Sequence, residues 1–301
     1  MSPLPAEPHA DPAERDRGGA RRGGAGGDGV PFAAVDAFTD RPFTGNPAAV
    51  VVVDAWPDDA WMAGVAAELA LSETAFVLAT GDPGRWGLRW FTPTIEVALC
   101  GHATLAAAHV LWEDGRVDAG TALAFDTRSG ELRAQRDGAR IVLDFPARPA
   151  TGAAAEPAGL AAVLPGARFL GVTEAAEPAE RNALVELDDP AALRAARPDL
   201  AALAAVEAVL GLIVTSPSDV PEADYLLRYF APRGGIPEDP VTGSAHCTTG
   251  PLWSDRLGRP ALRAHQASPR GGVLTVTTEG DRVHLGGQAV RTVTGRLHVA
   301  P

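Results

Sequence analysis

Short apolar runs bounded by Gly, Pro, Asn and Asp predict strands in the first half of the chain. The predicted strands are 32–38, 48–53, 74–79, 122–126 and 140–145. Two helices are predicted between them. Residues 58–70 are amphipathic with an acidic first turn, whereas residues 101–113 are apolar almost all round, so the second helix is expected to be buried.

The second half of the chain repeats the first. Residues 88–93 read Leu-Arg-Trp-Phe-Thr-Pro, and residues 227–232, which lie 139 positions later, read Leu-Arg-Tyr-Phe-Ala-Pro. Cys100 and Asp239 each follow nine residues after the Phe of their own copy, so they occupy equivalent positions. Further matches at nearly the same spacing indicate an internal duplication.

A duplicated unit predicts an α+β fold of two pseudo-symmetric lobes, each a curved sheet around one central helix. The expected divisions are a solvated tail at 1–30, an N-terminal lobe at 31–147 and a C-terminal lobe at 148–301. The helix starts at 101–104 and 242–245 should face each other across a cleft. Because helix starts present free N–H groups and a positive dipole end, this cleft is expected to bind an anion such as a carboxylate.

The composition excludes several classes of enzyme and of binding partner. All 26 basic residues are Arg, which excludes a Schiff-base lysine and a P-loop lysine, and the net charge of −12 argues against nucleic acid or an anionic membrane as partner. Two cysteines cannot form a disulfide framework, so a cytoplasmic protein is expected. There is no H-E-x-x-H, C-x-x-C or strand-linked G-x-G-x-x-G motif, and neither a metal nor a cofactor is predicted. No apolar run approaches the length of a membrane span.

Several long motifs occur in order along the chain. They read DAFTDRPFTGNPAAVVV, LSETAFV, FTPTIEVALCGHATLAAA, FAPRGGIPEDPVTGSAH and QASPRGG. Together they resemble the PhzF-like, phenazine-biosynthesis-type family, over about residues 32–299. The resemblance implies a diaminopimelate-epimerase-like fold. It also implies a homodimeric, cofactor-independent isomerase that shifts a double bond by proton transfer, as in a dihydro-hydroxyanthranilate.

The resemblance also implies roles for individual residues. The acid–base Glu of the family falls on Glu73, its His on His102, its Asp on Asp239 and its Ser on Ser244. Cys100 departs from the phenazine isomerase, which has no Cys there, whereas related amino-acid epimerases use a Cys at the corresponding turn.

Each candidate also has a purely structural interpretation. Glu73 can be a partly desolvated acid–base group or a solvated carboxylate at a helix–strand junction. His102 lies in the first turn of the buried helix, where the dipole disfavours imidazolium, so a neutral ring is expected, with backbone-satisfied burial as the alternative. Asp239 precedes Pro240, which is also a good N-cap arrangement.

The remaining candidate residues also have more than one interpretation. A helix start should lower the pKa of Cys100 and favour the thiolate, although a free Cys is more often inert and buried. Asn46 is a turn residue or a polar wall of the cleft. The helix starts at Gly101, Gly243 and Ser244 are expected to hold the substrate carboxylate, and Cys247 is expected in the core.

The principal hypothesis is therefore an isomerase for a small carboxylate-bearing metabolite, in which Glu73 moves the proton while His102 and Asp239 orient the reacting groups. One alternative is an epimerase or racemase that pairs Cys100 with a carboxylate. Another is a metabolite-binding protein without turnover.

Overall fold

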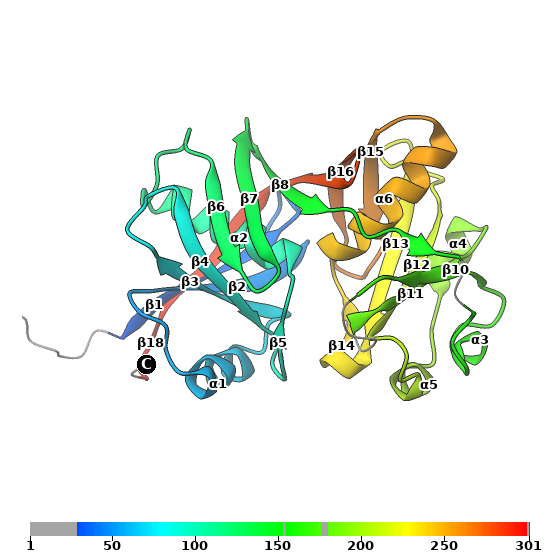
Figure 1. The fold of residues 1–301 in the computed structure, drawn as a ribbon, viewed down its shortest axis with the longest axis horizontal. Helices are drawn as coiled ribbons and strands as arrows, with labels where there is room; N and C mark the ends of the chain where they lie inside the picture. Colours follow the sequence, from blue (N-terminus) through cyan, green and yellow to red (C-terminus); the bar gives the residue numbers. More distant parts are fainter. Residues whose placement is uncertain (1–28, 153–154, 176–179, 300) are drawn as a thin grey trace, which may run out of the picture.

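The computed structural model describes residues 29–152, 155–175, 180–299 and 301. The predicted tail lies outside this range except for its last two residues, of which Val30 begins a strand. Two lobes of similar build lie side by side, each with strands wrapped around one long helix (Figure 1). The α+β fold of two such lobes is thus confirmed.

The first lobe encloses helix α2 (Gly101–Glu113), of which eleven residues are buried. Its strands are β1 (Val30–Ala37), β2 (Asn46–Val53), β3 (Glu73–Ala79), β4 (Arg85–Phe91), β5 (Glu96–Val97), β6 (Leu123–Thr127), β7 (Gly130–Asp137) and β8 (Arg140–Pro146). Helix α1 (Asp59–Leu69) packs on the outside through Met62 and Val65. An α2 that is apolar all round fits this arrangement, because the strands leave it no solvent-facing side.

The second lobe encloses helix α6 (Gly243–Leu257) in the same manner (Figure 1). Its strands are β9 (Ala150–Thr151), β10 (Arg168–Thr173), β11 (Asn182–Glu186), β12 (Gly211–Pro217), β13 (Tyr225–Ala231), β14 (Ile236–Asp239), β15 (Ala261–Gln266), β16 (Gly272–Glu279) and β17 (Arg282–Gly287). The short helices are α3 (Leu160–Val163), α4 (Pro190–Ala195), α5 (Leu200–Ala205) and the 3₁₀ turn η2 (Pro232–Gly234).

Strand pairing joins the lobes at two places. β8 pairs antiparallel with β17, with Leu143 opposite Leu285, so the two sheets are continuous. The last strand, β18 (Ala289–Leu297), returns to the first lobe and pairs antiparallel with β1. Both ends of the described chain therefore lie in the same sheet.

The elements agree closely with those expected from the apolar pattern. The strands expected at 32–38, 48–53 and 74–79 and the helices expected at 58–70 and 101–113 are all present, with ends shifted by one or two residues. The duplication is also visible, since the repeated hexapeptides lie on β4 and β13 and each copy is followed by its central helix.

None of the helices in the described ranges is long and apolar enough to cross a bilayer.

Candidate active site

The candidate residues lie where secondary-structure elements begin or end. Asn46 and Glu73 begin β2 and β3, which run parallel with Ala48 opposite Glu73. His102 lies in the first turn of α2, and Asp239 is the last residue of β14. All four side chains are buried, with 7% or less of each residue exposed. Strand and helix ends from both lobes thus converge on one point.

The two central helices meet head to head through glycine. A Cβ atom built on Gly101 would lie 3.0 Å from the Cα of Gly243, and the reverse distance is the same. Neither helix has a side-chain cap at its start. The two helix starts, neither of which has a side-chain cap, therefore share one location, as an anion site requires. The predicted facing of the two helix starts is confirmed.

Asn46 links the lobes at the centre of the site. Its Nδ2 donates to Asp239 Oδ1 at 2.7 Å and to the Val241 carbonyl at 2.8 Å. The same Nδ2 lies 3.0 Å from His102 Nδ1. The two oxygen acceptors take both N–H bonds of the Asn46 amide and fix its orientation. Asn46 is therefore fully buried and joins the two lobes through its amide, and it does not line the cavity described below.

Glu73 and His102 form the closest pair of proton-transfer groups. Glu73 Oε2 lies 3.0 Å from His102 Nε2. Both atoms are buried without a hydrogen-bond partner among the described residues. Buried polar atoms are nearly always satisfied, so this unsatisfied pair marks a candidate site, and Glu73 is the member that lines the cavity described below.

The charge of His102 is set by opposing influences. Burial lowers the pKa of the ring, but Cys100 and Glu73 raise it, and the net direction is upward. The expectation of a neutral ring, based on the helix dipole alone, is therefore wrong. Glu73, which the dipole argument does not include, favours the protonated form.

The surroundings of Asp239 shift the pKa of its carboxyl in both directions. Burial raises the pKa of its carboxyl to about 6, with a further rise from Glu73. His102 and the hydrogen bonds from Thr242 and Asn46 act in the opposite direction. A pKa near neutrality lets this carboxyl hold or release a proton under physiological conditions.

Cys100 does not behave as its position at a helix start predicted. Burial raises the pKa of the thiol to about 11, and Glu73 adds to the rise. Its Sγ lies 3.5 Å from His102 Nδ1. The prediction of a lowered pKa is therefore wrong, because desolvation outweighs the helix dipole at this fully buried position. Cys247 is buried in the core, as expected.

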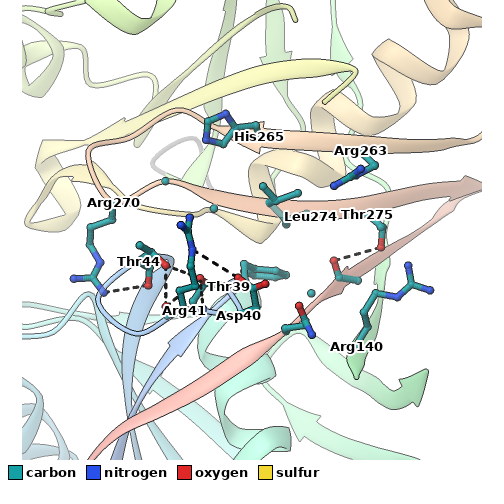
Figure 2. A pocket seen from close by; sticks show the side chains of 17 residues that line it. Thr39, Asp40, Arg41, Thr44, Arg140, Arg263, His265, Arg270, Leu274 and Thr275 are labelled. Atoms are coloured by element: carbon teal, nitrogen blue, oxygen red, sulfur yellow. Dashed lines mark hydrogen bonds and ion pairs between the residues drawn. The ribbon is translucent and has the colours of Figure 1, made fainter. Parts of the chain in front are cut away.

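A segment that the sequence analysis did not assign to the site, residues 266–271, braces both lobes. Gln266 Nε2 donates to the Asp239 carbonyl at 2.7 Å, and Gln266 Oε1 accepts from the Thr242 N–H at 2.7 Å. Arg270 reaches the loop before Asn46, where its Nε donates to the Gly45 carbonyl at 2.8 Å. Figure 2 shows this reach from Arg270 to the loop that carries Thr44. The only sequence signal was the QASPRGG motif that contains both residues.

A cavity of about 350 Å³ opens onto the site. Glu73, Asp239 and Ser244 line it, together with Thr242 and Tyr229. Apolar side chains form much of the remaining wall: Ile95, Val97, Leu99, Leu210 and Ile236. The volume suits a small metabolite. The larger cavity of about 590 Å³ in Figure 2 lies between the β1–β2 loop and strands β15–β17, and none of the candidate residues lines it.

Three ligating side chains stand close enough to share a cation. Atoms of Glu73, Cys100 and His102 all lie within 4.8 Å of one another. A metal would need the thiolate, whereas burial raises the pKa of the Cys100 thiol to about 11. His102 Nδ1 also faces the Asn46 amide. The donor set therefore suits proton transfer better than metal binding.

Comparison with known proteins identifies the family of the chain. The sequence model of the family described as phenazine biosynthesis-like protein (PhzC–PhzF) matches residues 35–295. An uncharacterized isomerase of Pseudomonas aeruginosa is 47% identical over 270 residues, which cover 89% of this chain and 98% of that protein. A mouse phenazine biosynthesis-like domain-containing protein is 40% identical, with 89% and 99% of the two chains covered.

Solved structures show the same relationship. A PhzF-family protein of Enterococcus faecalis superposes with a TM-score of 0.79 at 38% identity, over 90% of this chain and 100% of that chain. A probable proline racemase of Agrobacterium radiobacter shares the fold, with a TM-score of 0.61 at 12% identity. The chain therefore belongs to the phenazine biosynthesis-like (PhzC–PhzF) family, and it is an isomerase.

Proposed function

We propose that this isomerase moves a proton between two carbon atoms of a small carboxylate-bearing substrate, without a cofactor. Glu73 removes the proton as the C–H bond breaks, and the released electron pair forms a new carbon–carbon double bond. The old double bond opens and takes the proton back from Glu73 at its far carbon. The reaction needs no oxidant or reductant, because only a proton and a double bond change place.

The observation that carries this proposal is the state of Glu73. Its carboxylate is buried and lines the cavity, and Oε2 has no hydrogen-bond partner among the described residues. A desolvated carboxylate with one unengaged oxygen is suited to take a proton from carbon. His102 Nε2, 3.0 Å away, holds this carboxylate in position.

The other residues supply orientation and charge stabilisation. The uncapped helix starts at Gly101 and Gly243 support binding of the substrate carboxylate, with the Ser244 hydroxyl at the same end of α6. Asp239, with a pKa raised to about 6 by burial, is the second group that can hold a proton in the cavity. General acid–base transfer contributes about 10²–10⁴-fold, so positioning and exclusion of water supply the rest. A homodimer in the cytoplasm is part of the same proposal and rests on the sequence.

Isotope exchange tests the role of Glu73. Carboxylic acids are first screened for thermal stabilisation of the protein, and those that bind are incubated with it in D₂O. Mass spectrometry should show deuterium entering the carbon skeleton with the wild type and at most a trace with Glu73→Gln. Glu68→Gln, the same change on the exposed face of α1, is the matched control and should exchange as the wild type does.

The same assay separates the epimerase alternative. If Cys100→Ala abolished exchange while Glu73→Gln retained it, the thiol would be the acid–base group and the proposal would be wrong. The raised pKa of the Cys100 thiol, about 11, predicts instead that Cys100→Ala retains most of the exchange. Equal exchange by wild type and Glu73→Gln would likewise overturn the proposal.

A further inference from the structure

The cavity contains positive charge that the proton transfer does not use. Arg148 and Arg233 both line it. Arg233 Nη1 donates only to main-chain carbonyls, of Glu207 at 2.9 Å and Val209 at 3.1 Å. The Arg148 guanidinium forms no hydrogen bond or ion pair with any residue that the structure describes. Neither cation is paired with a carboxylate of the described residues.

Four acidic residues also line the cavity, and none of them forms an ion pair with Arg148 in the part of the chain that the structure describes: Glu73, Glu96, Glu180 and Asp239. Glu96 is paired with Arg89 at 2.8 Å and with Arg128 at 3.0 Å. Asp239 accepts hydrogen bonds from Asn46 and Thr242. These contacts leave the Arg148 charge free for a molecule in the cavity.

The backbone of Arg148 is fixed where the chain crosses from one lobe to the other. Arg148 follows β8 and precedes β9. Its N–H donates to the Cys247 carbonyl at 3.0 Å, which ties it to α6 one turn from Ser244. Arg148 and Ser244 line the same cavity and offer it two separate points of attachment.

An arginine in such a position is suited to one kind of partner. Its planar fork of donors matches the two oxygens of a carboxylate or phosphate, and the interaction is stronger away from bulk water. The first carboxylate of the substrate is assigned to the uncapped helix starts. Apolar residues such as Ile95, Leu210 and Ile236 line the same cavity, which suits a hydrocarbon portion of the substrate.

We propose that Arg148 binds a second oxyanion group of the substrate, so that the natural substrate is a dianion with two acidic groups on a short hydrocarbon skeleton. This inference rests on the proposed function for the first carboxylate and for the proton transfer. It adds a specificity-determining residue that the motifs of the sequence did not indicate.

Calorimetric binding of simple acids tests the inference. The probes are succinate, glutarate and 3-phosphonopropionate, with butyrate as a monoacid of similar length. The wild type should bind the diacid of best-fitting length at least tenfold more tightly than butyrate. Arg148→Gln should lose at least tenfold of that affinity and leave butyrate unchanged, whereas Arg148→Lys should retain part of the preference, because it keeps the charge without the fork. A preference for the phosphonate over both dicarboxylates would identify phosphate as the second group.

Two further variants separate this inference from the function it rests on. Arg140→Gln, on the strand that leads to Arg148 but outside this cavity, should bind all probes as the wild type does. Glu73→Gln should keep the diacid preference while losing deuterium exchange. If Arg148→Gln bound diacids as tightly as the wild type, or if no diacid were preferred to butyrate, the inference would be overturned and the proton-transfer proposal would stand unaffected.

Discussion

The contact between the two helix starts makes a sharp prediction for Gly101→Ala. The new methyl would lie 3.0 Å from the Cα of Gly243 and 3.6 Å from its N atom. Carbon atoms in contact prefer about 3.5–4.0 Å, so the shortfall is about 0.5–1 Å. The obstructing atoms belong to backbone, and relief requires α6 to move away from α2.

The magnitude follows from that geometry. Overpacking of this kind costs about 1–3 kcal/mol. Gly64→Ala is the matched control. Gly64 lies on the exposed face of α1, and an added Cβ there meets nothing within 4 Å. Ala in place of a mid-helix Gly stabilises by about 0.5–1 kcal/mol. The two variants should therefore differ in free energy of unfolding by about 1.5–4 kcal/mol, with Gly64→Ala the more stable.

Urea denaturation of both variants measures the difference. Calorimetry with a bound carboxylic acid measures the second consequence, since separating the helix starts disperses their N–H groups and should weaken binding to Gly101→Ala alone. Equal stability of the two variants, combined with unchanged binding of the acid, would refute the assignment of these helix starts to an anion site.

Two further predictions concern buried charge. Burial raises the pKa of Asp239 to about 6, above its unfolded value of 3.8, so the folded protein binds the proton more tightly. The contribution of protonated Asp239 to the free energy of unfolding is complete below about pH 3.8. It is lost as the pH rises through about 6. Asp239→Asn should remove that fall from thermal unfolding curves recorded between pH 4 and 7, and an unchanged slope would show that another group controls it. Arg228, whose side chain is 5% exposed, pairs with Glu238 at 2.7 Å. Arg228→Ala should cost about 3–5 kcal/mol in urea denaturation, because it leaves a carboxylate without its partner. Arg41→Ala, at a side chain 78% exposed, should change stability by less than about 0.5 kcal/mol. Similar losses in these two Arg variants would contradict the weight given to burial.

The fold was predictable because its signals are local or repeated. The apolar runs at 48–53 and 74–79 form adjacent strands, and 101–113 is the buried helix that its composition indicates. The hexapeptides at 88–93 and 227–232 showed the duplication, and with it the facing helix starts. Such patterns depend on side chains close in sequence, which a single chain displays directly.

The details of the site depend on residues that are distant in sequence but close in space, so they were harder to predict from the sequence. The lowered pKa expected for Cys100 failed because the helix dipole can be inferred from sequence, whereas complete burial cannot. The contacts of Gln266 and the position of Arg148 at the cavity were missed for a related reason, since both depend on segments distant in the sequence. The motifs assigned residues to the site but not the sign of their electrostatic shifts.

The brace formed by residues 266–271 has a consequence for the newborn chain. Asn46 emerges early from the ribosome, but the Arg270 contact that secures its loop and the Gln266 contacts that secure Asp239 emerge only near the end of synthesis. The partner strand of β1, β18, emerges later still. A nascent polypeptide that already contains Glu73 and His102 therefore lacks an assembled reaction centre until almost its whole length has been translated.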